Sequence, residues 1–176
     1  MTAGDDLAVV LAEREIQQVL LRYCRGIDRL DEDLIRSVYH EGSTDDHGVY
    51  QGDGQAFASF IVPRLRDAYR STTHSIHNCL IDLHGTADGA VADAETYCVA
   101  YHDRRDPAGE GWIDVFACRY VDRFERRAGR WGIVRRVVVH DWDAVLPVAG
   151  DFGEMVATFT GGRRDRTDES YRGMTV

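Results

Sequence analysis

The chain contains no lysine and few cysteines, and each shortage excludes a kind of chemistry. All 21 basic residues are arginines, so catalysis through a Schiff base on a lysine amine is excluded. The four cysteines lie far apart and form no C-x-x-C pair, so we expect neither a zinc site nor a redox site. We expect four free thiols in a reducing cytoplasm. They are Cys24, Cys79, Cys98 and Cys118.

Positive charge and long apolar runs are also scarce. The net charge is −9, whereas nucleic acids and anionic membranes bind clusters of cations. No apolar run approaches the ~18–20 residues of a membrane span. The first residues are acidic, unlike the basic start of a secretory signal. We therefore expect a cytoplasmic protein that binds neither nucleic acid nor membrane.

A chain of 176 residues fits one domain that buries a sizeable core. We expect that domain to cover residues 1–148. Residues 149–176 are polar and rich in glycine and arginine, so they are predicted to form an arm or a disordered tail. Only four apolar side chains in this tail could dock on the domain: Phe152, Met155, Val156 and Phe159.

Helices are predicted in the first part of the chain. Residues 7–30 carry apolar side chains at helical spacing, with a polar opposite face. Asp31 can cap a second helix that runs to Tyr39. A short strand is predicted over residues 47–51, and a third helix over 57–68, kinked or split at Pro63.

Strands dominate from Thr72 onward, over residues 72–84, 90–102, 111–126 and 131–142, with turn-like separators. Helices followed by long antiparallel strands predict an α+β fold. We expect a strongly curved, mostly antiparallel sheet, wrapped on one side by the helices, that encloses an apolar pocket. Both faces of the 111–126 strand are apolar, so we expect the helices to cover one face and a partner chain or the curl of the sheet itself to cover the other. We therefore also expect a homo-oligomer.

Three residue types suggest proton transfer in that pocket. Tyr23 could donate a hydrogen bond to a carbonyl or a leaving hydroxyl, and Asp28 could hold and stabilise an imidazole. The two lie about 140° apart on an ideal helix, so they converge only if the helix unwinds near Gly26 or if the pocket caps the end of the helix. A core tyrosine and an aspartate paired with a nearby arginine are the plain alternatives.

The imidazole would come from His74 or His77. Strand alternation puts His74 and Asn78 on one face and His77 on the other, so only one histidine can face the pocket. An unperturbed histidine pKa of about 6.5 suits a base near neutral pH. A structural strand histidine is the alternative.

Arg136 interrupts an apolar strand, and a buried arginine needs a carboxylate. It could clamp Asp28 or an anionic substrate group, or it could be a solvated arginine on an edge. The segments Asp45-Asp46-His47 and His140-Asp141-Trp142-Asp143 contain ligand types, but adjacent strand residues point in opposite directions, so we expect no metal site.

The order and spacing of several segments resemble the SnoaL-like branch of the NTF2-like superfamily over about residues 7–148. Within it, they are most similar to the group of scytalone dehydratase, bile-acid 7-alpha-dehydratase and hexachlorocyclohexane dehydrochlorinase. The segments are Arg22-Tyr23-x-Arg25-Gly26-x-Asp28 with Asp31-x-Asp33, Asp46-His47-Gly48-x-Tyr50-x-Gly52, His74-x-x-x-Asn78, Arg119-Tyr120-x-Asp122-Arg123-Phe124-Glu125, and Asp141-Trp142.

The resemblance implies a cone-shaped α+β barrel, often in dimers or trimers, and elimination or isomerisation without a cofactor. It assigns the histidine of the catalytic pair to His74, or to His77 if the alignment shifts. It assigns the aspartate to Asp28, the tyrosine to Tyr23 and a basic partner to Arg136. We expect a hydrophobic, cyclic small-molecule substrate and, as further pocket residues, Asn78, Tyr97, Tyr101, Trp112 and Phe116.

Dehydration is the reaction that we favour from the sequence. Two alternatives stay open. One is a small-molecule binder that has the fold without the chemistry. The other is an isomerase or cyclase that uses Asp28 directly as the base. The superfamily contains both kinds of protein, so the fold alone does not decide between them.

Overall fold

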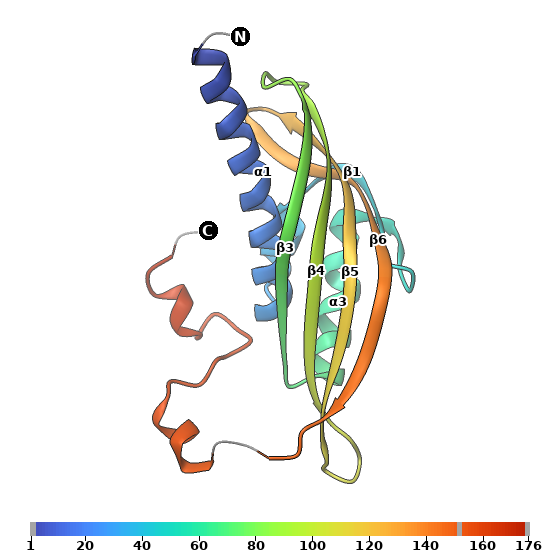
Figure 1. The fold of residues 1–176 in the computed structure, drawn as a ribbon, viewed down its shortest axis with the longest axis vertical. Helices are drawn as coiled ribbons and strands as arrows, with labels where there is room; N and C mark the ends of the chain where they lie inside the picture. The colour runs from blue at the N-terminus through green and yellow to red at the C-terminus, as the bar shows by residue number, and fades with distance from the viewer. Residues whose placement is uncertain (1–2, 151–152, 175–176) are drawn as a thin grey trace.

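The computed structural model describes residues 3–150 and 153–174. Three helices and six strands build the domain, and two short 3-10 helices follow them (Figure 1). Within the described residues, no helix is long and apolar enough to cross a membrane. The elements are α1 (Ala3–Arg29), α2 (Glu32–Ser37), β1 (Tyr39–Asp46), β2 (Gln51–Asp53), α3 (Gly54–Ala68), β3 (Ser71–His84), β4 (Val91–Arg105), β5 (Gly111–Arg127), β6 (Arg130–Pro147), η1 (Gly153–Thr158) and η2 (Glu169–Tyr171).

The six strands form one mixed, curved sheet in the order β2-β1-β6-β5-β4-β3. Only β1 and β6 pair in parallel, and the long strands β3 to β6 form an antiparallel meander. Helix α1 packs mainly on β3, and α3 packs on β1 (Figure 1). The predicted α+β class with helices on one side of a curved sheet is confirmed, although the sheet does not close into a barrel.

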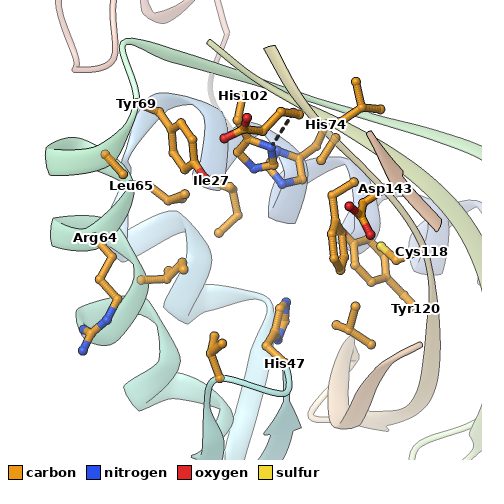
Figure 2. Close-up of a pocket in the computed structure, with 18 of the residues that line it drawn as sticks. Ile27, His47, Arg64, Leu65, Tyr69, His74, His102, Cys118, Tyr120 and Asp143 are labelled. Atoms are coloured by element: carbon orange, nitrogen blue, oxygen red, sulfur yellow. Dashed lines mark hydrogen bonds between the residues drawn. The ribbon is translucent and has the colours of Figure 1, made fainter. Parts of the chain in front are cut away.

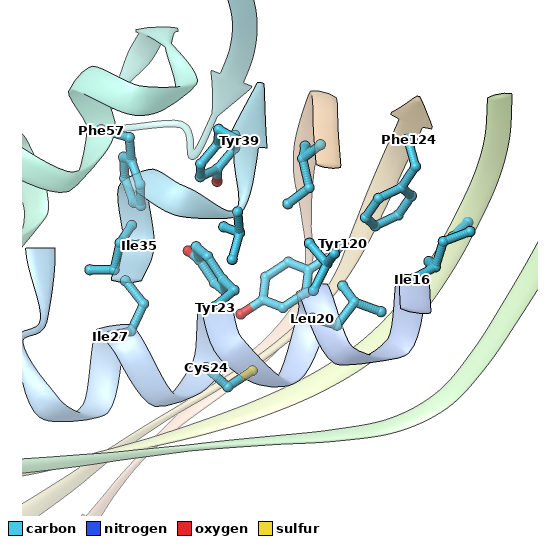
Figure 3. Packing of buried hydrophobic residues seen from close by; sticks show 14 of the residues in the cluster. Ile16, Leu20, Tyr23, Cys24, Ile27, Ile35, Tyr39, Phe57, Tyr120 and Phe124 are labelled. Atoms are coloured by element: carbon cyan, nitrogen blue, oxygen red, sulfur yellow. The ribbon is translucent and has the colours of Figure 1, made fainter. Parts of the chain in front are cut away.

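The apolar stripe of α1 forms the centre of the core (Figure 3). Ile16, Leu20 and Tyr23 are at most 2% exposed, because the sheet covers the face on which they recur every three or four residues. A Cβ on Gly26 would lie 2.8 Å from Ile35 Cγ1, so this glycine lets α2 pack closely against α1. Leu30, with φ of 53°, ends α1 and turns the chain toward α2.

Asp31 caps α2 as predicted, and its Oδ1 accepts a hydrogen bond from the Leu34 amide at 3.2 Å. The next segment differs from the prediction. Residues 39–46 form strand β1, although the second helix was expected to run to Tyr39 and no strand was predicted before residue 47. His47 lies in the connection from β1 to β2, and it is not part of a strand.

The last described residues pack on the domain along α1 and near the end of α3 (Figure 1). Arg164 donates to the carbonyls of Leu65 and Tyr69, which lie at the C-terminal end of α3. Arg166 and Tyr171 both contact the carboxylate of Asp31. These polar contacts attach residues 153–174, called the arm below, to the helices.

The apolar side chains expected to dock this arm do not do so. Met155, Val156 and Phe159 are exposed, and Phe152 lies outside the described residues. The arm is therefore attached through polar contacts, among them those of Arg164, Arg166 and Tyr171.

The face of the sheet opposite the helices carries exposed apolar side chains. A partner chain on this face remains a prediction, and with it the homo-oligomer. The side chains include Leu80, Tyr97, Tyr101, Trp142 and Leu146.

Candidate active site

A cavity of about 610 Å³ lies between α1, α3 and the concave face of the sheet (Figure 2). Most of its wall is apolar, with contributions from Ile27, Phe57, Leu65 and Val138. A cavity of this size fits a small organic molecule. Polar groups converge on it from several elements: Tyr23, His47, Tyr69, His74, His102, Asp114, Tyr120 and Asp143.

His74 and Asp28 form a hydrogen-bonded pair at one end of this cavity. The Nδ1 atom of His74 lies 2.7 Å from Asp28 Oδ1. Asp28 Oδ1 also accepts from Thr72 Oγ1, and Oδ2 accepts from the His74 amide, both at 2.9 Å. The carboxylate therefore holds the imidazole with a proton on Nδ1, which leaves Nε2 available to a molecule in the cavity.

The two strand histidines lie on opposite faces of the sheet. His74 lines the cavity, whereas His77 is exposed and lies in a depression on the outer face. The face predicted for Asn78 is wrong. A register shift between Ile76 and Cys79 adds a residue to β3, so Asn78 points outward with His77, and Cys79 points inward.

His102 lies beside His74, with the two ring centroids 5.6 Å apart (Figure 2). Burial, and next the charge of His74, lower the pKa of His102 to about 4. His102 is therefore a neutral imidazole at pH 7. The sequence analysis missed this residue, although it lies on the same face of β4 as Ala100, which lines the cavity next to it.

The hydroxyl group of Tyr23 contacts a second histidine rather than Asp28. Its hydroxyl oxygen lies 2.9 Å from His47 Nε2. The other ring nitrogen of His47 contacts Asp45 Oδ1 in a short hydrogen bond. Burial raises the pKa of Tyr23 well above its ordinary value, so the phenol keeps its proton.

Arg136 is buried, but Asp28 is not its partner. Its guanidinium donates to both carboxylate oxygens of Asp122, at 2.7 and 2.6 Å. The same guanidinium lies 4.2 Å from the ring centroids of Tyr23 and Tyr120. The prediction that Arg136 contacts Asp28 is therefore wrong. Arg136 affects the site through Tyr23, because a cation over a phenol ring favours the phenolate.

Only one of the five expected wall residues lines the cavity, namely Phe116. Tyr97 and Asn78 lie in the outer depression, and Tyr101 points outward on the same strand as Tyr97. Trp112 is on the inner face of β5, but its indole N–H donates to Asp106 at the end of the strand. The missed wall residues come from α3, such as Phe57, Ile61 and Leu65, and from strands β5 and β6.

These features define a class of protein: an α+β fold in which helices and a curved sheet enclose an apolar cavity containing a histidine–aspartate pair. The model of the SnoaL-like domain matches residues 8–137, which is most of the chain. The chain therefore belongs to the SnoaL-like domain family. Comparison with curated proteins gave no match.

Solved structures share the fold at low sequence identity. A candidate scytalone dehydratase from Novosphingobium aromaticivorans is 16% identical, with a TM-score of 0.67 and coverage of 83% of this chain and 96% of that one. Hexachlorocyclohexane dehydrochlorinase LinA-type3 from Novosphingobium barchaimii gives the same four values. The beta subunit of a candidate aromatic-ring-hydroxylating dioxygenase from Novosphingobium aromaticivorans is 22% identical, with a TM-score of 0.58 and coverage of 76% and 92%. These likenesses concern the fold alone, since the three proteins differ in activity.

Proposed function

We propose that this protein is a cofactor-independent lyase that removes water from a hydrophobic, cyclic small molecule. The observation that carries the proposal is the His74–Asp28 pair at the wall of an apolar cavity. The similar structures of a candidate dehydratase and of a dehydrochlorinase support the choice of an elimination. The apolar wall supports a hydrophobic substrate.

His74 would act as the base that removes a proton from carbon. His74 lines the cavity, and because its Nδ1 contacts Asp28, Nε2 is the ring nitrogen that is left for the substrate. Protonation of Nε2 makes an imidazolium, which the Asp28 carboxylate stabilises at 2.7 Å. This attraction is strong because the pair is shielded from water: the two side chains are 11% and 13% exposed.

The electron pair of the broken C–H bond would then form a carbon–carbon double bond and expel the neighbouring hydroxyl. A carbonyl next to the acidic carbon would make the proton easier to remove. The proposal therefore names cyclic β-hydroxy-ketones as the substrate class. Tyr23 would bind an oxygen of the substrate from its place in the cavity wall.

The neutral His102 supports this reading of the base. A positive charge on His102 would oppose the formation of the His74 imidazolium 5.6 Å away. Because the pKa of His102 is lowered to about 4, it stays uncharged at neutral pH and can contribute a hydrogen bond without this repulsion.

The test measures turnover of a panel of cyclic β-hydroxy-ketones. The absorbance of the conjugated product reports the reaction. We expect the wild type to dehydrate at least one member, and His74→Ala to lose that activity. His77→Ala is the matched control, because it removes the same side chain from the outer face of the same strand. It should retain wild-type turnover.

Two results would contradict the proposal. Ligands that bind in the cavity without any turnover across a broad panel would favour a binding protein. Activity that survives in His74→Ala would favour an enzyme that uses Asp28 directly as the base. The hydrogen bonds that Asp28 accepts from β3 speak against the second result, because they occupy both of its oxygens.

A further inference from the structure

The cavity is flanked by a second histidine–aspartate pair, formed by His47 and Asp45, opposite His74 and His102 (Figure 2). Asp45 Oδ1 contacts His47 Nδ1, and Asp45 Oδ2 accepts from the Tyr39 hydroxyl at 2.5 Å. His47 Nε2 lies 2.9 Å from the Tyr23 hydroxyl. A continuous chain of hydrogen bonds therefore runs from a buried carboxylate, through an imidazole, to a phenol in the cavity wall.

The packing holds this chain in place. The His47 ring stacks on Phe57, with centroids 4.1 Å apart. Tyr23 lies between Tyr39 and Tyr120, and the planes of both rings are nearly perpendicular to its own (Figure 3). The Asp45 side chain is fully buried, whereas the His47 side chain is 17% exposed. Only the histidine can exchange protons with solvent from this position.

The balance of buried charges indicates where the protons lie in this chain of hydrogen bonds. The nearby buried ions are the carboxylates of Asp45 and Asp122 and the guanidinium of Arg136, and Arg136 is already paired with Asp122. Among the described residues, Asp45 forms an ion pair with His47 and with no arginine. A buried carboxylate without a cation is costly, so a proton on His47 completes the balance.

A doubly protonated His47 donates from both ring nitrogens, one to Asp45 and one to the Tyr23 oxygen. The Tyr23 O–H is then free to donate toward the cavity, which Tyr23 lines. A neutral His47 would instead use Nε2 to accept the Tyr23 proton, and the phenol could no longer donate to a substrate. The protonated form is thus the one that makes Tyr23 an acid.

We propose that His47 and Asp45 are positioning residues that supply a proton, through the catalytic Tyr23, to the departing oxygen of the substrate. This inference rests on the proposed elimination. It divides the site into a basic half at His74 and Asp28 and an acidic half at Tyr23, His47 and Asp45. The substrate that needs both halves is one whose leaving group is a poor one, such as hydroxide.

The proton balance closes within the cavity. His74 Nε2 takes a proton from carbon, the C–H electron pair becomes the double bond, and the C–O electron pair stays on oxygen. That oxygen takes the Tyr23 proton and leaves as water, and Tyr23 recovers a proton from His47 Nε2. His47 then takes one proton from solvent, and His74 releases one.

The test compares two leaving groups on one ring, a cyclic β-hydroxy-ketone and its β-chloro analogue. Chloride needs no proton to depart, so it reports on the basic half alone. In His47→Gln, the amide can still donate to Tyr23 but cannot transfer a proton. We expect kcat for the hydroxy compound to fall by about 10²–10⁴, and kcat for the chloro compound to stay within about tenfold.

The control variants separate this role from structural damage. Tyr23→Phe should show the same selectivity for the hydroxy compound, and His74→Ala should slow both compounds. An equal loss of kcat on both compounds in His47→Gln would overturn the relay. It would indicate that the substitution damages the structure, or that His47 serves to bind the carbonyl group that both compounds share. If the wild type eliminates neither group, the proposed function fails, and the relay is decided by the next measurement.

That measurement needs no substrate. Long-range ¹H–¹⁵N NMR spectra of the ¹⁵N-histidine-labelled protein report how many protons each imidazole carries. We expect His47 to be doubly protonated at neutral pH in the wild type and to lose one proton in Asp45→Asn. A neutral His47 in the wild type, with an unprotonated Nε2 toward Tyr23, would overturn the proposal whatever the turnover experiments give.

Discussion

Replacement of Asp28 by asparagine should invert the tautomer of His74 while preserving the shape of the site. Asp28 Oδ1 contacts Thr72 Oγ1 and His74 Nδ1, and Oδ2 contacts the His74 amide. The amide N–H needs an acceptor, so the asparagine carbonyl takes the place of Oδ2. The NH₂ group then takes the place of Oδ1 and must donate to Nδ1, which has to give up its proton.

The opposite orientation of the asparagine would point its NH₂ group at the His74 amide. Two donors would then face each other in a mostly buried place, at a cost of about 1–3 kcal/mol. The tautomer change is therefore the cheaper solution. The change puts the His74 proton on Nε2. This nitrogen then has no lone pair with which to accept the substrate proton.

The effect on catalysis should be large and the effect on stability small. The same wrong-tautomer change costs about 10⁴ in kcat where an aspartate orients the histidine of a serine protease triad. Stability should fall by about 1–3 kcal/mol, because hydrogen bonds to a charged group become neutral ones. For a chain of this size that lowers Tm by roughly 2–12 °C, so the variant stays folded at 25 °C.

The assay has two parts, namely kcat on a dehydrated β-hydroxy-ketone and the tautomer of His74 from ¹⁵N NMR. Thr72→Val is the control, since it removes one donor to Asp28 and leaves the charge; its kcat should stay within about tenfold of wild type. An inverted tautomer with turnover intact would show that His74 is not the base. An unchanged tautomer would refute the hydrogen-bond argument itself.

Three further predictions concern stability. Asp122→Ala leaves Arg136 buried without its partner and should cost about 3–5 kcal/mol in urea unfolding; a loss below about 1 kcal/mol, the size expected for the exposed pair Arg123–Asp93, would contradict this. The pKa of His102 is about 4 in the fold and about 6.5 in the unfolded chain, so the unfolded state binds more protons between these values. Stability should therefore fall by up to about 3 kcal/mol as pH drops from 6.5 to 4, and His102→Gln should flatten that slope in urea unfolding. Asp31→Ala removes the cap of α2 and the contact with Arg166; it should cost about 1–2 kcal/mol and speed tryptic cleavage of the arm, and equal cleavage rates would speak against the anchoring role.

The periodicity of apolar residues was enough to predict the long helix and the long strands. The residue types alone were not enough to predict the short elements. The stripe of α1 and the alternation in β5 place Tyr23 and Phe116 on the side where the cavity lies. Strand β1 was missed because its sequence, Tyr39–Asp46, is polar and turn-like. Its strand form comes from partners on both sides, β2 and β6, which a local pattern does not contain.

The errors at the site have the same origin. Strict alternation along β3 correctly puts His74 and His77 on opposite faces, but the register shift after Ile76 moves Asn78 to the outer face. Arg136 was recognised as an arginine that needs a carboxylate, yet Asp122 sits beside it only through the pairing of β5 with β6. Asp45 and His47 were examined as metal ligands and rejected, and neither was given a catalytic role, because their spacing of two residues did not reveal the contact with Tyr23.

The topology of the sheet also has a consequence for the order of folding. The β3–β6 meander joins neighbours in sequence through short turns, so these contacts close with little loss of chain entropy. The contact of Asp28 with His74 spans 46 residues, and the parallel pairing of β1 with β6 joins Tyr39 to Ile133. The β3–β6 meander can thus form before His74 meets Asp28 and before β1 joins β6. Proton-transfer chemistry would then appear only in the final, slowest step of refolding, so recovery of activity should lag behind recovery of β-structure.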